Sequence, residues 1–152
     1  MTVEQEVETK VLELEHDIYY TTSSPFGMTR KLAERLDYDE YMVPFRYRKD
    51  PKRHTLLHAK EPYVLISPTY KTERDQNYVP RSIKEFLATF ENYKRMVGVI
   101  AVGNINFGDD YCMSGVMISE KFNVPLLGRI ELAGTREDVE DLNKHIAQLF
   151  NR

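Results

Sequence analysis

The sequence predicts a single α/β domain in which helices cover both faces of a five-stranded parallel sheet. Short apolar runs rich in β-forming residues alternate along the chain with segments of helical periodicity. The central runs are apolar without alternation, as expected for strands buried on both faces. Right-handed crossovers between parallel strands would place the helices on both sides of the sheet. The length of 152 residues fits one domain with one sizeable core.

The first elements of this domain follow residue 17. The run IYYT at residues 18–21 predicts a buried strand, because isoleucine and tyrosine favour extended backbone. Residues 29–36 have the apolar spacing of a short helix. A weaker strand is predicted at residues 41–45. The basic, proline-containing stretch at residues 46–54 is interpreted as an exposed connection.

The middle of the chain gives the clearest pattern. Residues 63–66 (YVLI) predict the third strand, and MVGVIAVG at residues 96–103 predicts the fourth. Between them, a helix is expected over residues 81–90, and Pro80 precedes it where a first-turn proline is tolerated. The apolar face of this helix is expected to end at Phe90.

The last third of the chain predicts one more strand, at residues 125–132, between two helices. The first helix follows the loop at residues 103–111, and its expected apolar residues are Met113, Val116, Met117 and Phe122. Thr135 and Asp138 have the spacing of a capping box at the start of the final helix. The apolar face of that final helix is expected to consist of Val139, Leu142, Ile146 and Leu149.

Residues 1–16 precede the domain at residues 17–152 and are interpreted as an N-terminal extension. Val3, Val7, Val11 and Leu14 recur at roughly helical spacing, so a short amphipathic helix is one prediction. Disorder, or an arm lying on the first strand, is an equal alternative. No function is assigned to this segment.

Composition excludes several classes of partner. The net charge of -3 gives no general attraction to nucleic acid, and no apolar run approaches the roughly 20 residues of a membrane helix. The single cysteine, Cys112, excludes an internal disulfide framework. The four histidines are scattered without a metal-ligand spacing, so no metal site is expected. A cytoplasmic protein without membrane or nucleic-acid partners is predicted.

A doubly wound sheet binds its ligands beyond the carboxyl ends of its strands, at the switch in strand order. The first loop at that edge, TTSSPFGMT, places hydroxyl groups and a glycine before a helix N-terminus, which favours an anion. It lacks the lysine motif of nucleoside-triphosphate sites, so a monophosphate ester is the expected ligand. A capping loop could use the same residues. The candidate residues are Thr21, Thr22, Ser23, Ser24, Gly27, Met28 and Thr29.

Two further loops reach the same edge. Thr69 and Tyr70 follow the third strand, and the tyrosine ring could stack on a planar heterocycle or pack on a neighbouring loop. GNINFGDDY follows the fourth strand, where asparagine amides match the edge of a pyrimidine-like ring. A structural turn could use the same glycines and asparagines. The candidate residues in this loop are Gly103, Asn104, Asn106, Phe107 and Gly108.

At this point the sequence resembles a known family. The segments YVLISPTY, VPRSIKEFL and VIAVGNINFGDDYCMSGVMISEKFNVPLLGRIELAGTREDVEDL are similar to the NrdI flavoproteins. The similarity extends over roughly residues 17–150. Its most specific part is GNINFG, followed at fixed spacing by ISEKFNVPLL and ELAGT.

The resemblance implies a flavodoxin-like fold that binds FMN. The phosphate would lie in the loop from Thr21 to Thr29, and the flavin ring would lie between Thr69–Tyr70 and Gly103–Gly108. Gly103 and Asn104 would contact the ring edge, while Phe107 and Tyr70 would stack on the ring or touch its edge. No side chain is predicted to act as a general acid or base, and the family protein itself binds no metal.

The resemblance also implies partners. Family members work with the dimanganese small subunit of a class Ib ribonucleotide reductase. Their reduced flavin converts dioxygen to superoxide or a related peroxide, which helps to form the tyrosyl radical of that subunit. The electron donor is not identified by the sequence.

Two alternatives stay open. A general flavodoxin, carrying electrons to several partners, would share the fold and the FMN. A flavin-free docking homologue is the other alternative, because SSPFGMT replaces the SSxTxNT pattern common in family phosphate loops. Lys71, Thr72 and Glu73 also stand where family members often have glycines.

Overall fold

The computed structural model describes residues 8–22, 27–44, 53–70 and 78–150. Its main sheet has five parallel strands in the order β3-β2-β5-β6-β7. These five confirm the five predicted strands, and only the predicted end at Phe45 lies outside the described residues. The strands are β2 (Ile18–Tyr20), β3 (Glu40–Met42), β5 (Tyr63–Pro68), β6 (Met96–Gly103) and β7 (Leu126–Glu131).

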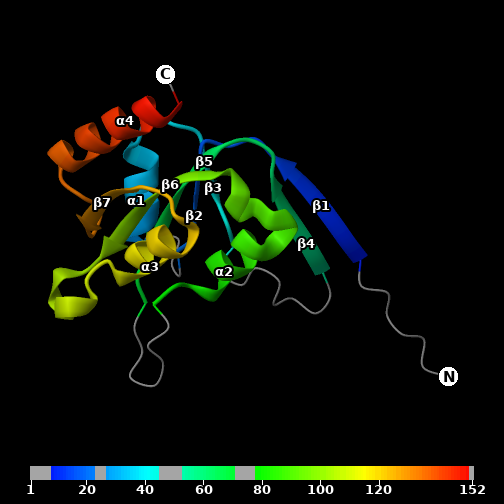
Figure 1. The fold of residues 1–152 in the computed structure, drawn as a ribbon, viewed down its shortest axis with the longest axis horizontal. Helices are drawn as coiled ribbons and strands as arrows, with labels where there is room; N and C mark the ends of the chain where they lie inside the picture. The colour runs from blue at the N-terminus through cyan, green and yellow to red at the C-terminus, as the bar shows by residue number, and fades with distance from the viewer. Residues whose placement is uncertain (1–7, 23–26, 45–52, 71–77, 151–152) are drawn as a thin grey trace.

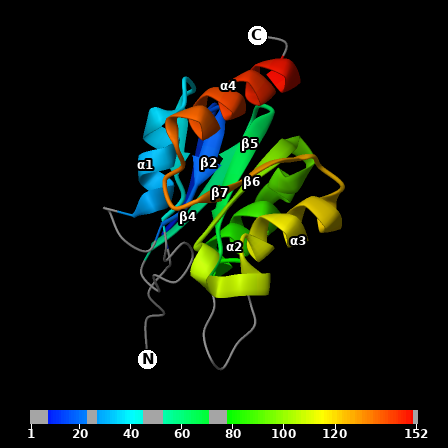
Figure 2. The same ribbon diagram turned by 90° about the vertical axis from the view of Figure 1, so that its left-hand side faces the viewer.

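Helices cover both faces of this sheet, as Figures 1 and 2 show. On one face, α1 (Met28–Arg35) and α4 (Arg136–Phe150) pack on alternate strand residues such as Ile18 and Ile66. On the other face, α2 (Arg81–Ala88) and α3 (Met113–Phe122) pack on Tyr19 and its neighbours. Two cores therefore form, because successive residues of a strand point to opposite faces. The predicted doubly wound α/β fold is confirmed.

The strand order reverses beside β2. The chain goes from β2 to β3 on one side and then to β5 on the other. This is the switch point of the flavodoxin-like order, and it opens a crevice between the loops that follow β2 and β5. The crevice determines where a ligand can bind.

The predicted N-terminal helix is wrong for residues 8–14. They form β1 (Glu8–Leu14), which pairs in parallel with β4 (Arg53–Ala59) in a separate two-stranded sheet, and not with the first strand of the main sheet. Leu12 and Leu14 face the core, while Val11 before them and Glu13 between them are exposed. The period is therefore two, and tertiary packing rather than helical spacing determines the conformation.

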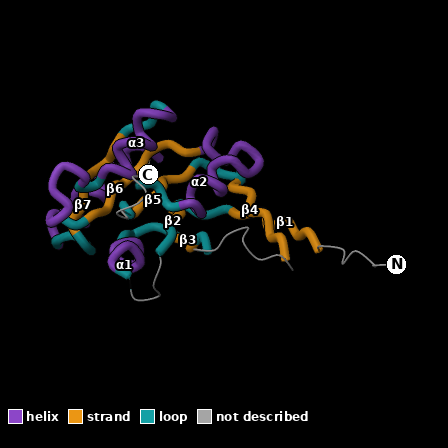
Figure 3. The backbone as a smooth tube through the Cα atoms, turned by 90° about the horizontal axis from the view of Figure 1, so that it is seen from below, coloured by secondary structure: helices purple, strands orange, loops and turns teal. Residues whose placement is uncertain are grey.

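The β4 strand also corrects the predicted exposed connection at residues 46–54. Residues 45–52 lie outside the described part of the chain, but Arg53 already belongs to β4. Leu57 and Ala59 are buried against the core on the α2 side of the main sheet. Figure 3 shows β1 and β4 beyond β2 and β3, at the end of the molecule opposite β7. The small sheet thus extends the α2-side core.

The helix predicted at residues 81–90 ends earlier, at Ala88, and continues as the 3-10 segment η1 (Thr89–Arg95). Phe90 and Glu91 have left-handed backbone angles, with φ of 49° and 56°. Phe90 is therefore turned outward and is 44% exposed, so its predicted place on the apolar helix face is wrong. The turn brings the next residues of η1 back towards β4.

Of the predicted apolar face of α3, Phe122 packs partly buried against the core, but the face as a whole is wrong. Ser114, Gly115 and Ile118 are the residues buried against the sheet, whereas Met117 is 41% exposed. The reason is a close approach: a Cβ added to Gly115 would lie 2.3 Å from the Cβ of Ala101 in β6. Only small residues fit there, and their low hydrophobicity hid this face in the sequence.

The final helix matches its prediction. The Asp138 carboxylate accepts from the Thr135 N–H at 2.8 Å, and the Thr135 hydroxyl accepts from the Asp138 N–H at 3.0 Å. These reciprocal bonds form a capping box. The buried residues of α4 are Val139, Leu142 and Ile146, with Leu149 partly buried beside them.

Asn92 joins the small sheet to the body of the protein. Its fully buried amide accepts from the Ala59 N–H at 3.0 Å and donates to the carbonyls of Leu57 and Phe86 at 2.8 and 2.9 Å. The Asn92 carbonyl also accepts from the Tyr63 hydroxyl at 2.8 Å. One buried side chain thus links the backbones of β4 and α2 by hydrogen bonds.

We predict that Asn92→Ala lowers the free energy of unfolding by about 2–4 kcal/mol, because it removes three buried hydrogen bonds to the backbone of β4 and α2. Urea unfolding measures this loss. Asn143→Ala is the matched control, since the Asn143 amide accepts from the N–H of Asp37, an exposed residue. That control should lose less than about 1 kcal/mol. Equal losses in the two variants would contradict the assigned role of Asn92.

Candidate functional site

A shallow depression of about 180 Å³ lies at the carboxyl ends of β2, β5 and β6. It sits at the switch point, where the fold directs a ligand. Its described lining residues are all uncharged: Thr22, Gly27, Met28, Thr29, Pro68, Thr69, Tyr70, Val102, Gly103, Asn104 and Leu132. Three loops far apart in the sequence therefore meet here, as the sequence predicts.

The N-terminus of α1 forms one side of the depression. Gly27 is the N-cap residue and has extended backbone angles, and within the described residues no side chain caps this helix. The first turn, Met28 to Lys31, contains no acidic residue. Gly27, Met28 and Thr29, at the start of α1, line the depression, and no side chain of the described residues is seen to cap the helix at Gly27. Together with the helix dipole, the N–H groups of this first turn suit an anion such as a phosphate ester.

The predicted hydroxyl groups of the first loop divide into two sets. Thr22 and Thr29 line the depression. Thr21 is fully buried beneath it, where its hydroxyl donates to the Val43 carbonyl at 2.8 Å and accepts from Ser82 at 3.3 Å. Thr21 therefore holds the loop after β2 against β3 and α2. The predicted residues Ser23 and Ser24 lie outside the described part of the chain.

The loop after β5 is fixed by α3. The Thr69 hydroxyl accepts from the Ser114 N–H at 3.3 Å, and the hydroxyls of Ser67 and Ser114 are 2.5 Å apart. Both serines are fully buried. Tyr70 continues into the depression, and its N–H donates to the Tyr78 carbonyl at 3.0 Å. Thr69 and Tyr70 therefore hold defined positions at the edge where they were predicted.

Gly103 allows the loop after β6 to approach α3 closely. A Cβ added to Gly103 would lie 2.8 Å from the Cys112 backbone nitrogen, which a real side chain could not tolerate. The Gly103 carbonyl accepts from the Leu132 N–H at 2.9 Å, so this residue also joins the loops after β6 and β7. The backbone at Gly103 is thereby fixed on the floor of the depression.

The remainder of that loop forms η2 (Ile105–Asp110). The Asn104 side-chain oxygen accepts from the Asn106 N–H at 2.9 Å, so the amide nitrogen is the group that Asn104 can offer to a ligand. Asn106 and Gly108 are exposed in η2 and do not line the depression. Gly108 has φ 61° and ψ -126°, a conformation that favours glycine. The Phe107 side chain lies outside the description.

Three lining residues were absent from the predicted set. Pro68 and Val102 are the last inward residues of β5 and β6, and Leu132 follows β7. The rule that ligands bind at strand ends could have indicated them, because each lies at the end of a predicted strand. They add apolar surface for a flat ring.

The thiol nearest the site is inert. Cys112 is fully buried behind Gly103, and its thiol donates to the Ala101 carbonyl at 3.4 Å. Burial raises the pKa of the Cys112 thiol, although hydrogen bonds from neighbouring groups oppose this effect. Burial likewise raises the pKa of Tyr111 to about 12. Both groups therefore stay protonated at neutral pH and bring no charge to the depression.

The sequence of this chain is similar to that of known proteins over most of its length. The sequence model of the family described as "NrdI Flavodoxin like" matches residues 18–144. The chain belongs to the NrdI family. The protein called NrdI in Rhodococcus jostii is 36% identical over 139 residues, which cover 88% of this chain and 84% of that protein. NrdI of Yersinia enterocolitica is 35% identical over 135 residues, covering 89% and 96% of the two chains.

Solved structures show the same fold. A flavodoxin of Streptococcus pneumoniae superposes with a TM-score of 0.54 at 13% identity, covering 92% of this chain and 99% of the flavodoxin. A short-chain flavodoxin associated with a bacterial microcompartment gives a TM-score of 0.51 at 16% identity, with coverages of 91% and 97%. The fold is flavodoxin-like, and the NrdI family membership implies a flavin cofactor.

The described residues contain neither a cluster of metal ligands nor a membrane-spanning helix. Among them, no three histidine, cysteine or carboxylate side chains gather as metal ligands. None of the helices in the described ranges has the length and apolar character of a membrane span.

We predict that Cys112 of the folded NrdI protein reacts with Ellman's reagent at least about 100-fold more slowly than the unfolded chain, because the thiol is buried and largely protonated. The pKa of the Cys112 thiol is higher in the folded protein than in the unfolded chain, so protonation of this thiol stabilises the folded state. This stabilisation is fully present below the pKa of the thiol in the unfolded chain. That contribution is lost as the pH rises through the folded pKa. A native thiol that reacts at the rate seen in denaturing urea would contradict the assigned burial.

Proposed function

We propose that this NrdI protein binds FMN in the depression and uses it to activate a ribonucleotide reductase. The observation that carries the cofactor is the N-terminus of α1, which no side chain in the described ranges caps, together with a fixed loop at Gly103 and Asn104 in the same depression. An anionic phosphate fits the first site, and the edge of a flat ring fits the second. FMN has both groups in one molecule.

The chain contributes binding and orientation. The α1 N–H groups and the hydroxyls of Thr22 and Thr29 would hold the phosphate. Tyr70 would lie against the ring, and the Gly103 backbone and the Asn104 amide nitrogen would contact its edge. Thr21 would support this loop from below rather than touch the phosphate. Ser23, Ser24, Asn106, Phe107 and Gly108 stay predicted contacts.

When bound and reduced, FMN supplies the electrons that convert dioxygen to superoxide or a related peroxide. The part of the lining that the structure describes is uncharged, which suits this reaction, since a carboxylate beside the ring would destabilise an anionic reduced flavin. We propose that the oxidant is delivered to the dimanganese small subunit of a class Ib ribonucleotide reductase, where it supports formation of the tyrosyl radical. The electron donor stays unidentified, and a cytoplasmic location stays a prediction.

Gly27→Asp tests the phosphate site. A carboxylate at this N-cap should support α1 but repel the phosphate. We predict that FMN binds about tenfold or more weakly to this variant, while riboflavin, which lacks the phosphate, binds within about twofold of the wild-type value. Fluorescence titration with both flavins measures the two affinities. Gly27→Asn is the matched control, because it caps the helix without charge and should retain FMN.

Unchanged FMN affinity in Gly27→Asp would place the phosphate elsewhere. A wild-type protein that loses all flavin on desalting would overturn the cofactor assignment and favour the docking homologue.

The partner is tested separately. We predict that the reduced, FMN-loaded protein and dioxygen generate a tyrosyl radical in the manganese-loaded class Ib small subunit, as measured by electron paramagnetic resonance. A general flavodoxin, reduced in the same way, is the control and should give little radical. Equal yields from both proteins would favour the general electron carrier over the activating partner.

A further inference from the structure

The small sheet formed by β1 and β4 has an open edge. β1 pairs with β4 over its whole length, from Glu8 to Leu14, without a shift in register. Within the described ranges, no other strand joins this sheet. Figures 1 and 3 show β4 between β1 and the main sheet, with β1 as the outermost described element. A regular edge strand of this kind can accept a further strand.

The hydrogen bonds of β1 show which of its backbone groups point outward. The Leu14 carbonyl accepts from the Lys60 N–H at 2.9 Å, so the backbone polar groups of Leu14 point towards β4. Because successive residues of a strand direct these groups to alternate sides, those of Thr9, Val11 and Glu13 point away from β4. Among the described residues, no backbone group pairs with them. Such a row of backbone groups is a template for strand addition.

The side chains beside this edge form an apolar patch. Val11 is 47% exposed, and its neighbour in β4 is the partly buried Leu56. Two residues further along β4, on the same face, the centroid of the His58 ring lies 4.8 Å from that of Phe90, which is 44% exposed. This patch would gain stability if a second apolar surface covered it.

The outward row is symmetric about Val11. In an antiparallel pair of β1 strands related by a two-fold axis, Val11 would lie opposite the same residue of the second copy. Thr9 would then lie opposite Glu13, and Lys10 opposite Leu12, so no like charges would face each other directly. The outward-pointing residues would face one another and exchange backbone hydrogen bonds. A pairing centred on Lys10 would instead place two lysines opposite each other.

We propose that the chain forms a two-fold dimer through its β1 strands, which joins the two small sheets in the order β4-β1-β1-β4. A two-stranded sheet has little stability of its own, and the dimer would give it four strands. The interface is smaller than that of most stable complexes, so we expect a dissociation constant of about 1–100 µM. The pairing shares no residue with the depression and does not depend on flavin binding.

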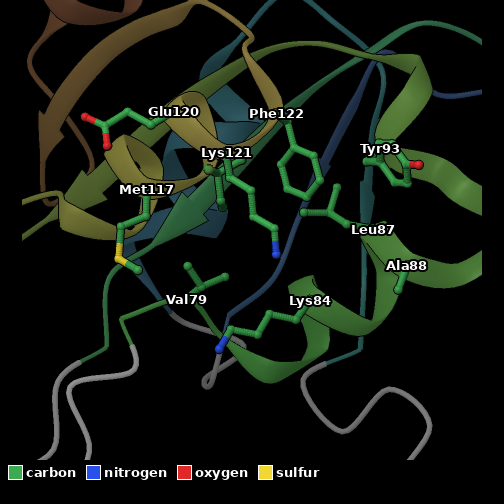
Figure 4. Close-up of a pocket in the computed structure, with 10 residues that line it drawn as sticks. Val79, Lys84, Leu87, Ala88, Tyr93, Met117, Glu120, Lys121 and Phe122 are labelled. Carbon is green, nitrogen blue, oxygen red and sulfur yellow. The ribbon is translucent and has the colours of Figure 1, made fainter.

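A second exposed apolar surface provides the control for this proposal. A cavity of about 820 Å³ lies between α2 and α3, and Figure 4 shows the side chains that line it. One of them, Met117, is 41% exposed, which is close to the exposure of Val11. Lys84, Glu120 and Lys121 also line the cavity, so charges of both signs border it. None of its lining residues belongs to a strand, so it offers no edge for strand pairing.

Sedimentation velocity of the full chain measures the dimer. We predict a shift from monomer to dimer between about 1 and 500 µM. Val11→Pro removes an outward N–H without removing a bond to β4, and Val11→Lys would place two like charges at the axis. Both variants should raise the dissociation constant at least about tenfold, while circular dichroism verifies that they are folded. Met117→Lys also replaces an exposed apolar residue by lysine and should leave the dimer unchanged.

Cross-linking tests the register. A short bismaleimide should join two copies of Val11→Cys, because the two Cα atoms at the axis would lie about 5.5 Å apart. The native thiol does not compete, since Cys112 is fully buried. Lys144→Cys is the matched control and should not cross-link, because Lys144 is exposed on α4, which Figure 1 shows far from β1.

Three results would overturn the proposal: a wild-type chain that stays monomeric at about 500 µM, a dimer that survives Val11→Pro, or a dimer in which Val11→Cys fails to cross-link. A dimer that Met117→Lys disrupts, while Val11→Lys does not, would instead assign the interface to the cavity between α2 and α3.

Discussion

The contact between Gly115 of α3 and Ala101 of β6 is the constraint on which the site depends. It leaves no room for a side chain and so fixes the height of α3 above the sheet. From that position the Ser114 N–H holds Thr69, and the Cys112 backbone requires a glycine at position 103. Both loops that would contact the flavin ring are therefore positioned by one close helix–strand approach. In the described part of the site, backbone geometry rather than charged side chains determines the shape of the depression.

The absence of charge from the described lining has a chemical consequence. The described lining offers a helix N-terminus and a few amide and hydroxyl groups, which in the proposed complex would face the phosphate and the ring edge. The buried Cys112 thiol and the partly buried Tyr111 phenol behind the loop stay neutral, because loss of contact with water raises their pKa values. In the proposed complex, such a lining would bind and orient the cofactor without competing for its protons.

The small sheet of β1 and β4 and the cavity between α2 and α3 both belong to the α2 side of the molecule. Asn92, which belongs to η1, forms hydrogen bonds with β4, and this attachment extends the core on the α2 side of the sheet. On the opposite side, the exposed Arg35 guanidinium of α1 donates to the carbonyls of Ala133 and Gly134 and so joins α1 to the turn before α4.

The sequence by itself determined the five strands, the final helix with its capping box and the three loops that meet at the sheet edge, because those features follow from local periodicity and capping chemistry. Only the tertiary structure decided that residues 8–14 form a strand, since a short two-stranded sheet is stable only against a core. It also decided which face of α3 is buried, and it turned Thr21 away from the ligand towards Val43. Contacts between distant segments, which no local pattern records, fixed these features.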